Sequence, residues 1–187
     1  MPSARPLAPL DTARLDRLAL RYVERFATTR VKLARYLARK IRERGWEGDI
    51  PPDPDALAER MAGLGYVDDA AFAEARAAAM ARRGLGARRI AGDLRYAGIG
   101  EDEREALRPA IEGRAEESAF AFARRRRIGP YAAVAPDRAG RDKALGQLLR
   151  AGHALDLARR IVAMMPGEQP EGGDDRFAPP VFKDGTT

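Results

Sequence analysis

One pattern of glycine and apolar residues occurs twice in this sequence. When the chain is shifted by 54 positions, five residues of segment 86–98 fall on identical residues of segment 140–152. The matched pairs are Gly86 and Gly140, Gly92 and Gly146, Leu94 and Leu148, Ala97 and Ala151, and Gly98 and Gly152. A repeat of this length indicates a unit too small to bury its apolar face alone. The chain is therefore expected to fold as an array of similar units.

The repeated unit is helical. Alanine, leucine and arginine dominate the composition and aromatic residues make up 6%, which favours helices over strands. The first apolar stripe has helical spacing and consists of Leu15, Leu18, Ala19, Tyr22, Val23 and Phe26. In the fourth helix the expected buried face consists of Phe72, Ala75, Ala79 and Met80. Apolar spacing, N-cap residues and glycine stops predict nine helices, at about 15–26, 30–44, 54–63 or 54–65, 69–83, 87–96, 101–112, 116–127, 138–150 and 154–164.

A fainter copy of the pattern precedes the two clear ones. With Gly45 placed on Gly98, Leu37 and Ile41 fall on Ile90 and Leu94. The last unit carries about six extra residues between its first two helices. We therefore predict an all-α fold of three tandem three-helix repeats that form an elongated, curved array. The expected segments are a disordered lead at 1–13, repeats at 14–66, 67–113 and 114–165, and a disordered acidic tail rich in proline and glycine at 166–187.

The glycine-rich segment 82–100 invites comparison with loops that bind phosphate. It contains neither a Walker sequence nor a Gly-x-Gly-x-x-Gly fingerprint, and no strand precedes it. Its glycines instead indicate helix boundaries: Gly84 and Gly86 separate two helices, and Gly98 suits a C-terminal position with positive φ. Gly92 lies inside a helix, where it is expected to let a neighbouring helix approach.

Several classes of function lack their residues. The chain has no cysteine and a single histidine, His153, which excludes thiolate or histidine metal sites and a Ser-His-Asp triad. Asp68, Asp69 and Glu74 are weighed as ligands of a metal-dependent nuclease, but helix capping is the favoured role for the two aspartates. No long apolar run or signal peptide is present, so a cytoplasmic protein is expected. We predict no enzyme activity, no cofactor and no metal.

Positive charge is the most informative chemical feature. The net charge is +6, and residues 166–187 hold five acidic and two basic residues, which leaves +9 on the preceding 165 residues. Segment 30–44 has seven basic residues and one acidic residue. Four of the basic residues lie within about 80° of one another on the helix, and no glutamate precedes them by four positions. These four are Lys32, Arg35, Arg39 and Arg42.

Two further basic clusters lie near the start of the second helix in the later repeats. One consists of Arg82, Arg83, Arg88 and Arg89, and the other of Arg124, Arg125, Arg126 and Arg127. If the repeats stack alike, the three clusters lie along one surface that binds a polyanion or an acidic groove. A solvated helix surface is the alternative for each cluster. Trp46 and Tyr96 are expected to pack rather than to stack on bases.

Segment 64–100, LGYVDDAAFAEARAAAMARRGLGARRIAGDLRYAGIG, resembles the central signature of the RecX family of regulatory proteins. The shared features are an apolar-Asp-Asp start, a Phe-Ala pair, basic residues before Gly-x-Gly, and an Arg-Ile followed by Leu and Gly-Ile. RYVERFATTRVKLARYLARKI resembles the first repeat of alphaproteobacterial-type members, and DKALGQLLRAGHALDLARRIV resembles the last repeat. The resemblance spans about residues 15–164. The third unit's long loop and the acidic tail depart from the common pattern.

The resemblance implies a protein of three tandem three-helix repeats that binds the RecA recombinase filament in its groove. Such proteins restrain filament growth, ATP hydrolysis, strand exchange and co-protease activity in recombination, DNA repair and the SOS response. It implies contacts by Arg82, Arg83, Arg88 and Arg89, whereas Lys32, Arg35, Arg39 and Arg42 rest on the helix-face argument. The expected partners are the RecA filament and single- or double-stranded DNA, and we expect a monomer. A general DNA-binding helical protein without RecA specificity is the alternative.

Overall fold

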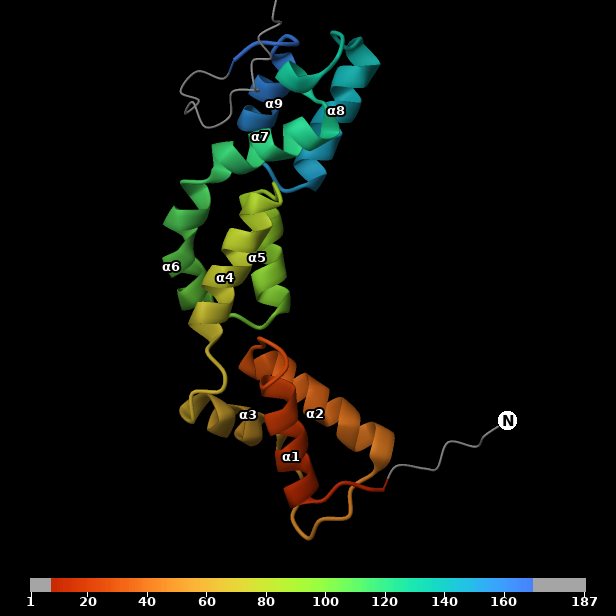
Figure 1. Ribbon diagram of the computed structural model, residues 1–187, viewed down its shortest axis with the longest axis vertical. Coiled ribbons are helices and arrows are strands. Elements are labelled where there is room, and N and C mark those ends of the chain that lie inside the picture. Colours follow the sequence, from red (N-terminus) through yellow and green to blue (C-terminus); the bar gives the residue numbers. More distant parts are fainter. Residues whose placement is uncertain (1–7, 170–187) are drawn as a thin grey trace, which may run out of the picture.

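The structure, a computed structural model, describes residues 8–169 (Figure 1). Within this range the chain forms nine α-helices and one 3-10 turn, and no strand. No helix in the described range is long and apolar enough to cross a membrane. The elements are α1 (Thr12–Val23), α2 (Arg30–Arg44), α3 (Pro54–Gly63), α4 (Asp69–Arg82), α5 (Ala87–Tyr96), α6 (Glu101–Glu112), α7 (Ala115–Arg126), η1 (Gly129–Tyr131), α8 (Arg138–Arg150) and α9 (Leu155–Ala163).

Side-chain caps fix the starts of five helices. In each case the capping oxygen accepts a hydrogen bond from the backbone N–H three residues later, at 2.7 to 3.1 Å. The capping residues are Asp11, Thr29, Asp53, Asp68 and Asp137. Such a bond satisfies one of the amides that every helix start leaves without a partner. The predicted caps Thr29 and Asp53 are confirmed, and Asp68 is the cap at the start of the fourth helix.

The nine helices form three units, each with its own apolar core. The core of α1–α3 contains Leu33, Leu37 and Leu57. The core of α4–α6 includes Ile90 and Leu94. The core of α7–α9 contains Phe122, Leu148 and Ile161. The units follow one another in an elongated, curved array (Figure 1), which confirms the predicted fold class.

The second helices of the three units join end to end. At the end of α8, the carbonyl of Ala151 accepts a hydrogen bond of 2.9 Å from the N–H of Gly86, the N-cap of α5. The next carbonyl, Gly152, accepts from the N–H of Arg88 at 3.2 Å. Gly152 has φ +96°, and a Cβ there would lie 2.5 Å from the Arg89 nitrogen. The carbonyl end of α8 therefore meets the amide end of α5.

The junction between the first two units has the same plan. The Thr29 hydroxyl, at the N-cap of α2, donates to the carbonyl of Ala97 at 2.6 Å. Gly98 has φ +85°, and a Cβ there would overlap the side chain of Val31. Ala97 and Gly98 are 54 positions before Ala151 and Gly152, so the strongest part of the repeat marks the joints of the array. Its Leu94 and Leu148 are both fully buried core residues.

The two outer ends of the array are covered by short segments. Leu10 is 0% exposed, and its backbone bonds to Gly45 and Glu47 at 2.9 Å each. At the other end, Gly167 donates to the carbonyl of Pro130 in η1 at 2.9 Å. The predicted disordered lead at 1–13 is therefore wrong for residues 10–13, because Leu10 is buried, Asp11 caps α1 and the helix begins at Thr12. Most of the predicted tail lies outside the described residues.

Three predicted side-chain positions are wrong. Phe26 lies beyond the end of α1 and is 51% exposed. The buried residues of α4 are Ala73, Ala77, Met80 and Ala81, so the core face is turned from the predicted one and shares only Met80 with it. A Cβ at Gly92 would have no atom within 4 Å. No helix of the described range approaches Gly92, in contrast to the prediction.

The different surroundings of Gly152 and Gly92 predict that substitution of the two glycines has opposite effects on stability. Gly152→Ala is expected to lower the free energy of unfolding by about 2–4 kcal/mol, because it imposes positive φ on alanine and breaks a joint. Gly92→Ala is expected to raise it by about 0.5–1 kcal/mol, because it fills open space and favours the helix. Urea unfolding measures both. Equal effects of the two substitutions would contradict the proposed role of the joint.

The buried histidine predicts sensitivity to mild acid. His153 is 2% exposed, and its Nε2 donates to the carbonyl of Gly84 at 3.1 Å, whereas Nδ1 has no partner among the described residues. Burial lowers the pKa of His153 from its ordinary 6.5, and the Gly84 bond opposes this. The unfolded chain therefore takes up the proton first. Stability is present above about pH 6.5 and is lost as the pH falls below that value towards the folded-state pKa.

We expect the free energy of unfolding to fall by about 1 kcal/mol between pH 7.5 and 5.5. His153→Gln, which keeps an amide donor for Gly84 and cannot titrate, should lose much less over this range. Carboxyl groups have ordinary pKa values below this pH range, so their titration contributes little within it. A variant that loses as much stability as the parent would show that another group is responsible.

Candidate functional site

Charge differs between the second helices of the three units and the third helix of the middle unit. Basic residues outnumber acidic ones by seven to one in α2, three to one in α5 and four to one in α8. In α6, by contrast, five acidic residues face two basic ones. Figure 1 shows α2, α5 and α8 along the right side of the array, with α6 on the left. The end-to-end second helices therefore form a basic column along one side of the array.

Lys32, the first predicted contact residue, lies inside the first joint. Its Nζ stands 4.5 Å from the centroid of the Phe72 ring, across the boundary between α2 and α4. Burial lowers the pKa of Lys32, the positive charge of Arg76 lowers it further, and Asp93 opposes both. Lys32 is half-buried against the second unit, so its ammonium group belongs to the joint more than to the exposed surface.

Arg35 and Arg88 bind backbone carbonyls of the following unit. Arg35 Nη1 donates to the carbonyl of Tyr96 at 3.1 Å. Arg88 Nη2 donates to the carbonyl of His153 at 3.0 Å. The two arginines correspond under the alignment that places Gly45 on Gly98. Each guanidinium lies beside the carbonyl end of a second helix, where a cation is stabilised, so both residues clamp a joint.

The remaining predicted residues of α2 are partly neutralised. Arg39 pairs with Glu43 at 3.5 Å, and Lys40 pairs with it at 2.6 Å. The pKa of Glu43 is lowered, first by the hydrogen bond from Lys40 and further by the charges of Lys40, Arg39 and Arg42. The inference that the absence of a glutamate four positions earlier leaves these basic residues unneutralised is therefore wrong, because Glu43 follows Arg39 by four positions. Arg42 is exposed, with no hydrogen bond or ion pair of its own in the described part of the chain.

The other predicted clusters divide between two sides of the second joint. Arg82 lines a cavity of about 220 Å³ together with Arg114 and Glu117, away from α5. Arg83 is the exposed C-cap of α4. Arg89 is exposed on α5, where its charge contributes to lowering the pKa of Asp93. Only Arg88 and Arg89 of this cluster therefore belong to the basic column.

The four arginines at 124–127 are all exposed at the end of α7. The guanidinium of Arg124 lies 5.2 Å from the Tyr131 ring centroid, and that of Arg126 lies 5.8 Å from the Phe122 ring centroid. Arg127 has φ 54°, the one positive φ of a non-glycine residue in the described range. Arg127 ends α7 with the same hydrogen-bonded turn that Gly84 forms at the end of α4. These residues come from a first helix and lie off the column.

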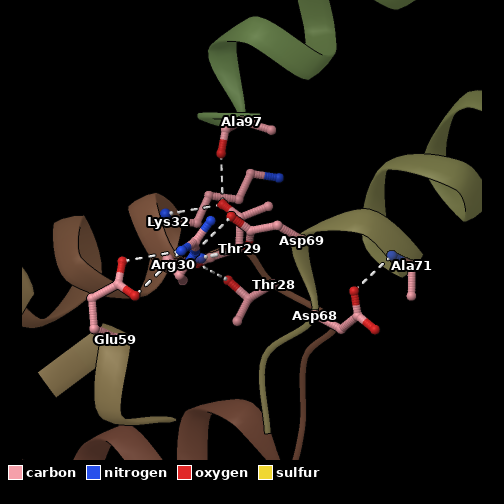
Figure 2. A network of polar contacts seen from close by, with 9 residues as sticks. All are labelled: Thr28, Thr29, Arg30, Lys32, Glu59, Asp68, Asp69, Ala71 and Ala97. Atoms are coloured by element: carbon pink, nitrogen blue, oxygen red, sulfur yellow. Dashed lines mark hydrogen bonds and ion pairs between the residues drawn. The ribbon is translucent and has the colours of Figure 1, made fainter. Parts of the chain in front are cut away.

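A polar network at the first joint escaped the sequence analysis (Figure 2). The side chain of Asp69 accepts hydrogen bonds from the Arg30 backbone N–H at 3.0 Å and from Arg30 Nε at 3.1 Å. Arg30 also bonds to Glu59 at 3.2 Å. These two acids raise the pKa of Arg30, mainly through their hydrogen bonds. Asp69 therefore joins two units, and Asp68 caps α4 through the N–H of Ala71 (Figure 2).

The second missed feature is an ion pair within the middle unit. Arg76 on α4 bonds to Asp93 on α5 through two parallel contacts of 2.7 and 3.0 Å. This bond is the main reason why the pKa of Asp93 is lowered. No group of acidic or histidine side chains in residues 8–169 could hold a metal ion. The site is thus an extended basic surface suited to binding, composed of exposed arginines beside others committed to the joints.

Tyr96 also differs from its prediction. It was expected to pack, yet it is 77% exposed, at the end of α5 beside Arg35. Trp46, by contrast, packs against the core of the first unit as predicted. The exposure of Tyr96 could have been predicted from its position on the charged side of α5, the side that also carries Arg89.

Known proteins share both the sequence and the fold. Residues 68–107 match the second three-helix domain of RecX. A regulatory protein RecX of Thermobifida fusca (strain YX) is 34% identical over 161 residues, which cover 83% of this chain and 80% of that protein. The regulatory protein RecX of Myxococcus xanthus (strain DK1622) is 28% identical over 160 residues, 81% of this chain and 86% of that protein.

A solved structure agrees in fold. The crystal structure of RecX from Lactobacillus salivarius matches with a TM-score of 0.60 at 21% identity, over 80% of this chain and 93% of that one. The repeat array, the central signature and the identity over four-fifths of the Thermobifida relative lead to one conclusion. The chain belongs to the RecX family of regulatory proteins.

Proposed function

We propose that this protein binds RecA filaments and restrains their growth. ATP hydrolysis, strand exchange and co-protease activity of RecA fall as a consequence. The protein acts by binding alone, with no chemical step of its own. Family membership supports the choice of RecA as partner, and the basic column supports the manner of binding.

The observation that carries the proposal is the end-to-end alignment of α8, α5 and α2. A filament presents its subunits at regular intervals, and an elongated array can contact more than one of them at once. Positive side chains along one side suit an acidic protein groove and the DNA phosphates within it. Binding across neighbouring subunits opposes the rearrangements that filament growth requires.

Direct DNA binding without RecA specificity is the second candidate, and the same basic column favours it. The exposed basic residues of the column are arginines and lysines, which can contact the phosphates of DNA of any base sequence. Comparison of bare single-stranded DNA with RecA-coated single-stranded DNA separates the two candidates. Tighter binding to the coated strand supports the proposal, and equal binding supports the alternative.

Two exposed arginines of the column provide the mutational test. Arg42→Gln with Arg89→Gln should weaken binding to RecA-coated DNA about tenfold, the equivalent of about 1.4 kcal/mol, and reduce inhibition of the RecA ATPase accordingly. Arg60→Gln with Arg108→Gln is the matched control, because it removes the same charge from α3 and α6. Arg60 and Arg108 form exposed ion pairs with Asp16 and Glu105, which contribute little to stability.

Loss of inhibition in both double variants would show that total charge matters and the column does not. Absence of ATPase inhibition by the parent protein would reject the proposed function. Arg35 and Arg88 are unsuitable for this test because their substitution also loosens a joint.

Salt should weaken binding steeply if charge carries it. We expect the dissociation constant for RecA-coated DNA to rise at least tenfold between 50 and 200 mM salt, because several phosphates or carboxylates exchange counterions for arginines. Fluorescence anisotropy at a series of salt concentrations measures the slope. An affinity that does not change with salt would indicate an apolar interface in place of the basic column.

A further inference from the structure

The exposed side of α5 combines features that the fold itself does not use. Ile90 and Leu94 point from α5 into the core of the middle unit. The opposite side of the helix, turned away from these two core residues, carries Arg89, Gly92 and Tyr96 within about 60° of one another on the helical wheel. We call this surface, with the adjoining Arg35 of α2, the Tyr96 face.

Tyr96 stands at the centre of this face without cover. Its side chain is 77% exposed. The guanidinium of Arg35 lies 5.9 Å from the ring centroid and donates to the Tyr96 carbonyl, which holds the end of α5 in place. An exposed tyrosine next to arginines has the composition of an interface hot spot, because its ring buries a large area at a small cost in conformational entropy.

Gly92 leaves bare backbone one helical turn before Tyr96. A glycine inside a helix costs about 1 kcal/mol relative to alanine. No neighbour within residues 8–169 explains it, since a Cβ at this position would have no atom of that range within 4 Å. The α8 helix shows the same arrangement, with Lys143, Gly146 and Arg150 at the positions of Arg89, Gly92 and Tyr96. A Cβ at Gly146 would meet only the flexible end of Arg150.

The chemistry of the face favours a protein over a nucleic acid. The backbone N–H groups inside a helix already donate to carbonyls one turn earlier, so Gly92 offers no donor to a phosphate. Asp93 adds a carboxylate to the edge of the face, although Arg76 binds it through two hydrogen bonds. Bound in this way, the carboxylate does not distinguish acidic side chains from phosphates, and it is the bare backbone at Gly92 that admits a closely packed protein segment. Arg89 calls for an acidic side chain on that segment, whereas Arg35 is committed to the Tyr96 carbonyl.

We propose that the Tyr96 face is the surface on which an acidic segment of the filament protein packs, with Tyr96 as its anchor and Gly92 as the point of closest approach. The inference rests on the proposed function, because it names the surface that contacts the filament protein. Regions of the column away from this face remain free to contact DNA.

The test separates stability from binding. Gly92→Gln fills open space with a good helix former, so its melting temperature should be equal to or higher than that of the parent protein. Its affinity for RecA-coated single-stranded DNA should nevertheless fall about tenfold, because the new side chain occupies the contact. Tyr96→Ala should cause a loss of similar size. Affinity of both variants for bare single-stranded DNA should stay within about twofold of the parent value.

Ala91→Gln is the matched control, because Ala91 is an exposed neighbour on the same helix, about 100° from Gly92. It should leave both affinities unchanged. If Gly92→Gln and Tyr96→Ala bind coated DNA as the parent does, the inference is wrong and the proposed function stands. If both lose affinity for bare DNA to the same extent, the face binds nucleic acid and the inference is again wrong. A parent protein that does not bind coated DNA overturns both proposals.

Discussion

The array depends on the meeting of two helix ends. A helix leaves carbonyls without partners at its C-terminus and amides without partners at its N-terminus. At the second joint these groups satisfy each other, since Ala151 and Gly152 accept from Gly86 and Arg88. At the first joint a threonine hydroxyl takes the place of the amide and bonds to Ala97. The helix dipoles also align, with a negative end against a positive end.

Because the joints require positive charge, structure and binding draw on the same residue types. Arg35 and Arg88 hold carbonyls of the next unit, and Arg30 is held by Asp69 and Glu59. A ligand that attracts these arginines therefore competes with the joints. One that uses Arg42, Arg89 and Tyr96 leaves the joints intact, and binding of this second kind preserves the shape of the column. Whether a basic residue holds a joint or is exposed therefore indicates its role better than the number or spacing of basic residues in the sequence does.

The helices and their caps were predictable from local signals, and the joints were only partly so. Segment 30–44 was bounded correctly because Thr29 and Gly45 are clear start and stop residues. The 54-residue echo contained Ala97 and Gly98, yet nothing local indicated that these residues touch Thr29 and Val31. Gly92 and Gly98 look alike in the sequence, but one faces open space and the other a joint. Their difference depends on contacts between units, which periodicity within one helix does not describe.

Short segments of the described chain cover both outer ends of the array. Gly45 ends α2 with positive φ, as Gly98 does just after α5. There Leu10 bonds to Gly45 and Glu47 on either side of Trp46. At the far end, η1 and Gly167 lie where α7 leads towards α8, and Gly129 packs against the Ile161 carbonyl. The Gly45 carbonyl at the end of α2 is thus engaged by Leu10, and the Pro130 carbonyl of η1 is engaged by Gly167. Attachment of another unit to the end of α2 by the same kind of joint would have to displace Leu10 from the Gly45 carbonyl.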